Sequence, residues 1–465
     1  MTNTDFTSTI KIICTIGPAT WDENVMREII NKGMNVARIN AAFADTSELI
    51  RVQKLVRSIN PTVALMLDIK GPEVRLNKFP EPIALNEDTL LEIGSDSSAQ
   101  IYPITYPQLY TKLKLGQRIL VGDGEVALEV VEIKLSSFIV KPVYGELLKP
   151  GKALNVPGVQ LSDNPLTERD LNLLKVAIEN EWEFVSASFI RNKADAQLIK
   201  DHLTNSNMQL IAKIEDGEGV RNIAEIIDVV DGIMIARGGL GVELGIEKVP
   251  VVQRILTREA LLRKIPVITA TQMLESMIYN PVPTRAEAND VATAVISGSD
   301  SIMLSGESSA GKYPVLAVSF MQAVNIDVNK ALKANNLNLI NEHGFTYYTK
   351  PLALHTSFDE EFRKHYKTDL KAIVIYSPNG KELNEITNYY LTQPRIAIVK
   401  NQYTANQLNI VKGLTETFNN WEESNSQKPN YTIIKEDLKS KNIYGKVLLI
   451  STSNKGTFLE ILSVE

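Results

Sequence analysis

The chain has 465 residues, of which 44% are hydrophobic and 22% are charged, and its net charge is −6. This composition is typical of a globular protein and excludes a chain that is mainly disordered. The length predicts about three domains. The small negative net charge makes nucleic acid an unfavourable partner.

A single cysteine, Cys14, excludes an intramolecular disulfide and a zinc site built from cysteines. The sequence starts without the basic segment and apolar run of a secretory signal. No stretch approaches the roughly 18 apolar residues of a membrane span. We therefore expect a cytoplasmic protein without membrane contact.

Eight short apolar runs predict parallel strands that are covered on both faces, because they are rich in Val, Ile or Ala and lack polar alternation. They are Ile10–Thr15, Val36–Ile39, Val63–Asp68, Phe184–Ser188, Leu210–Ile214, Gly232–Ala236, Pro266–Ala270 and Ser301–Leu304. Amphipathic segments predict helices at Glu23–Asn31, Thr46–Ser58, Leu166–Asn180, Lys193–Leu203, Gly219–Val229, Glu247–Arg263, Thr284–Ser297 and Ala310–Ala334. Thr284 and Glu287 have the spacing of a capping box. The alternation favours an α/β fold built on a (β/α)8 TIM barrel, with an open doubly wound sheet as the alternative.

Residues 69–183 separate the third and fourth predicted strands and contain short strand-like runs with Gly and Pro turns. They predict a small β-barrel lid domain inserted into the barrel. After about Leu339, further runs such as Ala372–Tyr376, Arg395–Val399 and Lys446–Ser451 predict a C-terminal α/β domain. The expected boundaries are 1–75 and 158–339 for the two parts of the barrel, 76–157 for the lid and 340–465 for the C-terminal domain.

The carboxyl ends of barrel strands meet at one mouth, where active sites lie. The fifth predicted strand ends in Lys213-Ile-Glu215, and the spacing of two places the side chains of Lys213 and Glu215 on one face. A lysine there can stabilise negative charge on a phosphoryl group or an enolate, and a glutamate can bind Mg²⁺. The alternative is a salt bridge that only closes the barrel end.

Other strand ends carry further candidates. Arg38 can bind a phosphate and Asn40 can offer an oxygen to a monovalent cation, although Arg38 also fits an ordinary ion pair at the rim. Gly238 and Gly239 leave backbone amides accessible to a carboxylate, or form a plain strand-to-helix turn. Thr271 supplies a hydroxyl, or caps the next helix.

Several motifs occur in one order along the barrel. They are Ile13-Cys-Thr-Ile-Gly-Pro18, Leu67-Asp-Ile-Lys-Gly-Pro-Glu-Val-Arg75, Ser186-Ala-Ser-Phe-Ile-Arg191, Lys213-Ile-Glu215, Asp231-Gly-Ile-Met-Ile-Ala-Arg-Gly238, Ala270-Thr-Gln-Met-Leu-Glu-Ser-Met277, Pro283-Thr-Arg-Ala-Glu287 and Met303-Leu-Ser-Gly-Glu307. In these motifs the sequence resembles the pyruvate kinase family. The resemblance runs from Lys11 to about Pro314, includes the lid, and is only an outline in the C-terminal domain.

The resemblance implies transfer of the phosphoryl group of phosphoenolpyruvate to ADP, which gives pyruvate and ATP in glycolysis. It implies Mg²⁺ or Mn²⁺, usually K⁺, and a homotetramer. The residues that match the family's catalytic residues are Lys213, Arg38 and Thr271. The implied contacts are Gly238, Gly239, Thr271 and Lys213 with the substrate, Glu215 with Mg²⁺, Asn40, Asp68 and the carbonyl of Ile69 with K⁺, and Arg38, Lys152 and Asp123 with the nucleotide.

Four departures from the family pattern follow from the same comparison of motifs. Gly239 stands where the family has an aspartate that is its second Mg²⁺ ligand. Ala41-Ala-Phe-Ala44 replaces Phe-Ser-His-Gly, so that Ala42 lacks a K⁺-binding hydroxyl and Phe43 replaces a histidine near the nucleotide. Ile69 replaces a threonine, and Ser377-Pro-Asn-Gly-Lys381 replaces a Ser/Thr-rich loop that binds sugar-phosphate effectors in many members, which predicts that this effector site is absent.

These residues support two main hypotheses. The first is an active pyruvate kinase with an altered metal site, which the retained Lys213, Glu215, Arg38 and Thr271 favour. The second is a catalytically impaired paralogue that binds metabolites or regulates partner subunits, which the changes near the cation and nucleotide sites favour. A third, an aldolase or lyase that acts on pyruvate or phosphoenolpyruvate, gives the lid no role.

Overall fold

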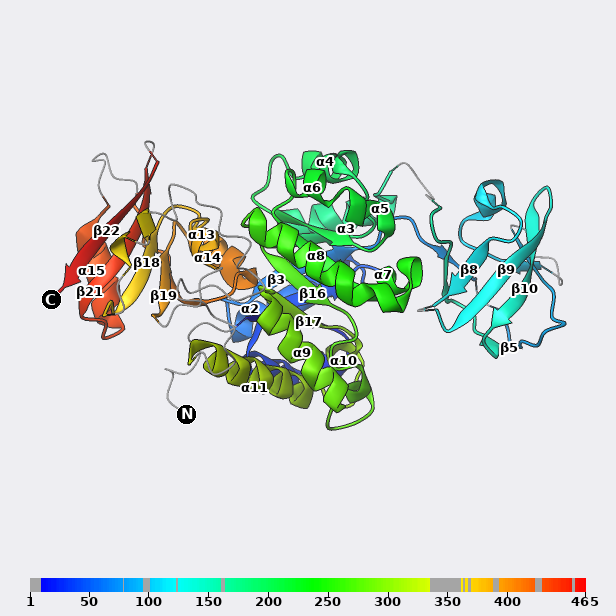
Figure 1. The fold of residues 1–465 in the computed structure, drawn as a ribbon, viewed down its shortest axis with the longest axis horizontal. Coiled ribbons are helices and arrows are strands. Elements are labelled where there is room, and N and C mark those ends of the chain that lie inside the picture. Colours follow the sequence, from blue (N-terminus) through cyan, green and yellow to red (C-terminus); the bar gives the residue numbers. More distant parts are fainter. Residues whose placement is uncertain are drawn as a thin grey trace.

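The computed structural model describes residues 10–77, 79–94, 101–122, 124–159, 164–334, 361–362, 364–366, 369–387, 393–422, 429–453 and 456–465. Its strands form a closed barrel, a seven-stranded sheet with a separate two-stranded pair, and a five-stranded sheet (Figure 1). A central barrel lies between an inserted sheet at one end and a C-terminal sheet at the other. The boundaries expected from the sequence stay predictions, and the boundary at residue 340 lies outside the described residues.

Eight parallel strands close the central barrel in the order β1-β17-β16-β15-β14-β13-β3-β2. Their bounds are β1 Lys11–Thr15, β2 Met34–Asn40, β3 Ala64–Ile69, β13 Phe184–Ala187, β14 Gln209–Ile214, β15 Gly232–Ala236, β16 Val267–Ala270 and β17 Ser301–Leu304. Each of the eight predicted strands is present, to within two residues at either end. The predicted TIM barrel is confirmed, and the open sheet is wrong.

Helices surround the barrel strands. Their bounds are α1 Glu23–Asn31, α2 Thr46–Ile59, α3 Glu168–Glu179, α4 Lys193–His202, α5 Gly217–Arg221, α6 Ile223–Ile227, α7 Arg237–Leu244, α8 Val249–Leu262, α9 Arg285–Ser297, α10 Gly306–Ser309 and α11 Pro314–Lys333. The predicted helix at Gly219–Val229 is wrong in detail, because the segment forms the two short helices α5 and α6. Helix α7 was not predicted, since its glycines lower the helical propensity.

The capping box predicted for α9 is present. The Thr284 hydroxyl oxygen accepts a 3.2 Å hydrogen bond from the Glu287 amide, and the Glu287 carboxylate accepts a 2.7 Å bond from the Thr284 amide. The same carboxylate accepts bonds from the amide and hydroxyl of Ser276. The cap therefore satisfies amides of the first helical turn and also fixes the loop before it.

The inserted sheet lies between β3 and β13 in the chain. Seven of its strands pair in the order β4-β12-β8-β9-β10-β6-β7, and two more, β11 and β5, pair with each other. The bounds are β4 Val74–Arg75, β5 Ile83–Ala84, β6 Leu91–Gly94, β7 Ile101–Pro103, β8 Arg118–Val121, β9 Val126–Ile133, β10 Ser137–Tyr144, β11 Leu147–Leu148 and β12 Ala153–Asn155. An antiparallel bridge between Leu76 and Ile104 joins the segments that follow the two edge strands, so the sheet curls back on itself. Its buried side chains form a hydrophobic cluster of their own.

The C-terminal sheet has the order β20-β19-β18-β21-β22, in which β22 alone runs antiparallel to its neighbour. Its strands are β18 Ala372–Tyr376, β19 Arg395–Ile398, β20 Leu414–Phe418, β21 Gly445–Ser453 and β22 Gly456–Val464, and its helices are α13 Leu383–Ile386, α14 Gln402–Gln407 and α15 Tyr431–Ser440. The sequence predicted three of these strands. β20 and β22 were missed because polar residues interrupt their apolar pattern.

The C-terminal sheet packs on the amino-terminal ends of the barrel strands. The Lys11 ammonium donates a 3.0 Å hydrogen bond to the Leu414 carbonyl, and the Ser301 hydroxyl donates one to the Ile410 carbonyl. Side chains from the barrel interior and from the C-terminal sheet belong to one continuous hydrophobic cluster. The opposite, carboxyl-terminal end of the barrel faces the inserted sheet (Figure 1).

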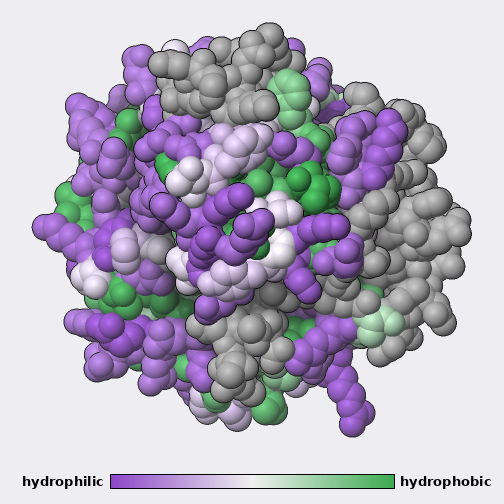
Figure 2. Space-filling view, turned by 90° about the vertical axis from the view of Figure 1, so that its left-hand side faces the viewer, coloured by the Kyte–Doolittle hydropathy of each residue, from purple (hydrophilic) through white to green (hydrophobic). Residues whose placement is uncertain are grey.

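The surface of the molecule on the C-terminal side is mostly hydrophilic where it is described, with apolar side chains in small patches (Figure 2). In the part of the chain that the structure describes, no helix combines the length and the apolar character that a membrane span needs.

Candidate active site

Alternation along the barrel strands places a polar layer above the apolar interior. Ile13, Val36, Met66 and Ile211 lie in the interior cluster. Two residues further along each strand, on the same face, stand Thr15, Arg38, Asp68 and Lys213. The top layer of the barrel is therefore charged, and it lies at the end that faces the inserted sheet.

Asp68 is the centre of this layer and is only 1% exposed. Its Oδ2 atom accepts a 2.8 Å hydrogen bond from Nε of Arg38, and its Oδ1 atom accepts a 3.0 Å bond from Nζ of Lys213. Arg38 also donates through Nη1 to the hydroxyl of Thr15 at 2.7 Å. Three strands, β1, β2 and β3, thus contribute to one network with β14.

Lys213 is held by three acceptors. Besides Asp68, its Nζ atom lies 2.7 Å from the hydroxyl of Ser188 and 3.0 Å from Oε1 of Glu215. The prediction that Lys213 and Glu215 share one face is confirmed by this contact. The salt bridge that was its alternative is also present, and the proposed role of the pair toward substrate and metal stays a prediction.

Burial and charge oppose each other in this network. Burial alone would raise the pKa of Asp68, but the charges of Arg38 and Lys213 outweigh it and hold the pKa below its usual value. Burial would lower the pKa of Lys213, but Asp68 and Glu215 keep it above its usual value. Glu215 has one cationic partner instead of two, and burial raises its pKa. Lys213 is therefore a fixed positive charge, while Glu215 binds a proton more readily than an ordinary glutamate.

Thr271 and Gly238 lie together on neighbouring strand ends. The amide of Gly238 donates a 2.8 Å hydrogen bond to the Thr271 hydroxyl oxygen, and that hydroxyl donates to the Ala270 carbonyl at 2.7 Å. Both predicted substrate-binding groups are thus adjacent at the mouth. Thr271 does not cap a regular helix, because the segment after it is a turn that leads to the short 3₁₀ helix η4, Glu275–Ile278.

Gly239 lies directly beside Glu215. A Cβ atom at position 239 would stand 3.0 Å from Cβ of Glu215, so a side chain there would run alongside the glutamate. No carboxylate occupies that place, and the described residues contain no group of three or more His, Cys, Asp or Glu side chains that could hold a metal ion. Mg²⁺ keeps water ligands and takes phosphate oxygens, so Glu215 alone fits a weak site completed by a substrate.

The residues predicted for K⁺ are neighbours, because Asn40 and Asp68 are paired in the register of β2 and β3. Their oxygens already have partners. Oδ1 of Asn40 accepts from the Ala42 amide at 3.0 Å, and the Ile69 carbonyl accepts from the Ser188 amide at 3.2 Å. The carboxylate of Asp68 is shared between two cations, which reduces its attraction for a third.

Two of the residues predicted to contact the nucleotide, Lys152 and Asp123, belong to the inserted segment. Asp123 lies outside the described residues. Lys152 is on the inserted sheet, where Nζ pairs with Oε1 of Glu125 at 2.9 Å, and its side chain is 38% exposed. Phe43 follows β2 and is 82% exposed, so a large aromatic ring stands free at the barrel mouth.

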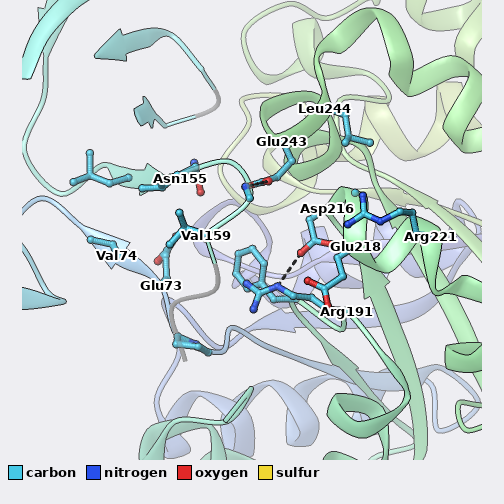
Figure 3. A pocket seen from close by; sticks show the side chains of 16 residues that line it. Glu73, Val74, Asn155, Val159, Arg191, Asp216, Glu218, Arg221, Glu243 and Leu244 are labelled. Atoms are coloured by element: carbon cyan, nitrogen blue, oxygen red, sulfur yellow. Dashed lines mark hydrogen bonds and ion pairs between the residues drawn. The ribbon is translucent and has the colours of Figure 1, made fainter. Parts of the chain in front are cut away.

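A cavity of about 360 Å³ lies where the inserted sheet meets the barrel (Figure 3). Arg191 pairs through Nε with Oδ2 of Asp216 at 3.0 Å on its barrel side. The amide of Gly158, in the chain that returns from the sheet, donates to Oε2 of Glu243 at 3.2 Å. Burial raises the pKa of Glu243. The bond between Gly158 and Glu243 ties α7 to the chain that returns from the inserted sheet, whereas the pair of Arg191 and Asp216 joins the ends of β13 and β14.

Asp170, at the start of α3, holds the other connection of the inserted sheet. Its Oδ1 atom accepts from the Lys70 amide and its Oδ2 atom from the Gly71 amide, each at 3.2 Å. Lys70 also pairs with Glu73 in the same connection. Lys70 therefore helps to anchor this connection, whereas Asp68 turns inward to the charged layer.

Sequence reasoning missed the residues that hold the predicted ones. Thr15 and Ser188 are partners of Arg38 and Lys213 and were quoted only within motifs. Ser188 lies two residues beyond Ser186 of β13, so the alternation of the strand was the signal that could have revealed it. Arg237 was quoted only within a motif, and its partner Asp290 was missed. The two lie 53 positions apart in sequence, where no local pattern links them.

Comparisons with known proteins agree with this architecture. The model of the family described as pyruvate kinase, barrel domain, matches residues 7–318. The chain is 36% identical over 421 residues to pyruvate kinase of Geobacillus stearothermophilus, which covers 87% of this chain and 70% of the relative. It is 35% identical over 429 residues, with the same coverage, to pyruvate kinase of Staphylococcus aureus strain USA300.

Proposed function

Because the chain belongs to the pyruvate kinase family, we propose that it transfers the phosphoryl group of phosphoenolpyruvate to ADP. The carrying observation is that Lys213 is held by Asp68 and Ser188 next to Glu215 at the barrel mouth. An ion pair that only stabilised the fold would need no such convergence of strand ends. The proposal includes a glycolytic role in the cytoplasm and assembly into a homotetramer, which the family resemblance supports.

The reaction moves negative charge between two oxygens. The bond from phosphorus to the enol oxygen of phosphoenolpyruvate breaks, a bond to a terminal β-phosphate oxygen of ADP forms, and the enolate left behind takes a proton at carbon to give pyruvate. Lys213 and Arg38 would stabilise the charge on the phosphoryl oxygens. Both have their charges fixed by Asp68, so they need not reorganise when substrate binds.

The remaining roles concern the substrate and its cations. The Thr271 hydroxyl and the amides of Gly238 and Gly239 would hold the substrate carboxylate and the enolate, and Lys152 and Asp123 would lie near the nucleotide. Glu215 would hold Mg²⁺ or Mn²⁺. A bound divalent ion would neutralise part of the negative charge on the phosphoryl oxygens. Asn40, Asp68 and the Ile69 carbonyl would share their oxygens between K⁺ and their present partners.

A second candidate function is supported by Gly239. Without a second carboxylate next to Glu215, the site attracts a divalent ion less strongly, and Ala42 and Phe43 alter the neighbouring loop. A catalytically impaired paralogue, which binds the same metabolites and regulates partner subunits, would show these changes. The charged layer around Asp68 favours the active enzyme, because buried charges are costly to retain without use.

Pyruvate formation from phosphoenolpyruvate and ADP tests the proposal. It is followed over a wide range of Mg²⁺ and Mn²⁺ concentrations, with and without K⁺, for the unaltered protein, Gly239→Asp and the neutral control Gly239→Asn. We expect turnover by the unaltered protein at high metal concentration and a half-saturating Mg²⁺ concentration at least about tenfold lower in Gly239→Asp only. No turnover in the unaltered protein, with activity gained in Gly239→Asp, would establish the impaired paralogue.

A further inference from the structure

Thr271 and Gln272, two consecutive non-glycine residues after β16, adopt left-handed backbone angles. The φ angles are +68° at Thr271 and +51° at Gln272. β-branched residues rarely adopt this conformation, which is strained and persists only where the surroundings impose it. Thr271 is also the residue proposed to contact the substrate. The contacts that impose this backbone are therefore of functional interest.

Arg237, the first residue of α7, makes these contacts. It is only 9% exposed, and its guanidinium lies against the main chain that follows β16. Nε donates to the Thr271 carbonyl at 3.1 Å, and Nη2 donates to the same carbonyl at 2.5 Å and to the Gln272 carbonyl at 3.2 Å. Nη1 pairs with Oδ2 of Asp290 on α9 at 2.6 Å.

The next residue of α7 holds Thr271 from the other side. The amide of Gly238 donates to the Thr271 hydroxyl oxygen at 2.8 Å, as described above. The side chain of Arg237 thus fixes the carbonyl of Thr271, while the main chain after Arg237 fixes its hydroxyl. A lysine could keep the charge near Asp290, but a single ammonium cannot reproduce the planar fork that reaches two successive carbonyls.

We propose that Arg237 is a positioning residue that fixes the left-handed conformation of Thr271 and thereby the direction of its hydroxyl. Asp290 orients the guanidinium from α9. The inference rests on the proposed function, because it concerns the residue that would contact phosphoenolpyruvate. A displacement of about 1 Å of such a group can lower a rate about 100-fold.

A double-mutant cycle tests whether Arg237 acts through Thr271. The kcat and KM for phosphoenolpyruvate are measured at saturating metal for the unaltered protein, Arg237→Gln, Thr271→Ala and the double variant. We expect kcat to fall at least about tenfold in Arg237→Gln, and the double variant to be no slower than Thr271→Ala alone. Arg237→Lys should recover only part of the loss. Losses that multiply in the double variant would overturn the inference.

Arg57 provides a matched control at the opposite end of the barrel. Its guanidinium also donates to two main-chain carbonyls, those of Pro61 and Val63, and pairs with the buried Glu183. Arg57→Gln should lower the melting temperature without changing the KM or kcat, which separates positioning from stability. An Arg237→Gln variant that behaves like Arg57→Gln would contradict the inference, as would an Arg237→Lys variant with full activity.

If Arg237→Gln fails to fold, Asp290→Asn is used in its place. This variant removes the charge that orients the guanidinium. It should lower kcat and also be non-additive with Thr271→Ala, and multiplicative losses here would again overturn the inference. An unaltered protein that neither turns over phosphoenolpyruvate nor binds it in calorimetry would overturn the proposed function and this role together. If the unaltered protein turns over phosphoenolpyruvate but the kcat losses of the Arg237 and Thr271 variants are independent, only the role of Arg237 is overturned.

Discussion

Asp68 and Arg38 are joined across the neighbouring strands β3 and β2 by a 2.8 Å hydrogen bond between Oδ2 and Nε. Both side chains are almost fully buried, at 2% and 8% exposed. Lys213 shares the same carboxylate, so the negative charge of Asp68 lies between two positive charges. Asp68 is therefore the residue on which the charged layer depends.

Asp68→Asn should leave Arg38 and Lys213 buried beside a neutral amide. We expect the free energy of unfolding to fall by about 3–5 kcal/mol, which is typical for removal of one partner from a buried ion pair. Denaturant unfolding at pH 7 measures it. Glu23→Gln is the control, because it removes the exposed partner of Arg27 and should cost less than about 1 kcal/mol. Equal losses in the two variants would contradict this account.

Ser188→Ala removes one acceptor of Lys213 and keeps its two carboxylate partners. The ammonium can then turn away from its present direction, so kcat should fall by about threefold to tenfold, the equivalent of one hydrogen bond. Steady-state kinetics measures the change, and the melting temperature should stay within about 3 °C of the unaltered protein. A large loss of stability with unchanged kcat would show that the hydroxyl only supports the fold.

Ala42→Ser tests the cation site near Asn40. In the unaltered protein we expect weak stimulation by K⁺, because position 42 lacks a hydroxyl and Asp68 already has two cationic partners. The serine adds an oxygen ligand and should increase the ratio of activity with K⁺ to activity without it. Ala44→Ser, in the same loop, is the control. Strong K⁺ stimulation of the unaltered protein would show that the present oxygens suffice.

The stability of the protein should rise with pH through the titration of Lys11. Burial lowers the pKa of its ammonium from 10.5 to about 8. Between these values the unfolded chain binds the proton and the folded chain does not, so raising the pH favours folding. The free energy of unfolding should gain on the order of 2–3 kcal/mol from this group between about pH 8 and pH 10.5.

Lys11→Met isolates this contribution. Denaturant unfolding at several pH values should show a smaller rise in the variant than in the unaltered protein, while the exposed control Lys141→Met should keep the full rise. Identical pH dependence in Lys11→Met and the unaltered protein would show that the ammonium remains protonated against the Leu414 carbonyl.

The sequence predicted the barrel well because each strand is a short run of apolar residues, a pattern that parallel strands impose on both faces. It predicted Lys213 with Glu215 from their spacing of two, which is a local geometric property. It did not predict α7, because glycines lower the helical propensity of that segment. It also did not predict β20, because polar residues interrupt its apolar pattern. Local preference is weak there, and tertiary contacts decide the structure.

The candidate site shows the same division. Strand ends identified Arg38, Asp68 and Lys213 one by one, but the network that joins them depends on the order in which the barrel closes. The hydrogen bonds from Arg237 to the main chain at Thr271 could not be predicted, because the acceptors are main-chain carbonyls that any residue would supply. A side chain that binds the backbone leaves no pattern in the sequence of its partner.

The hydrophobic cluster that the barrel interior shares with the C-terminal sheet determines how the two parts unfold. Since the barrel interior and the C-terminal sheet bury the same surface, neither can lose its structure without exposing the other to water. The two should denature in a single transition, and removal of the C-terminal sheet should leave a barrel prone to aggregate. The inserted sheet has its own cluster, so it can melt separately, which makes it the part of the molecule best suited to move as a unit.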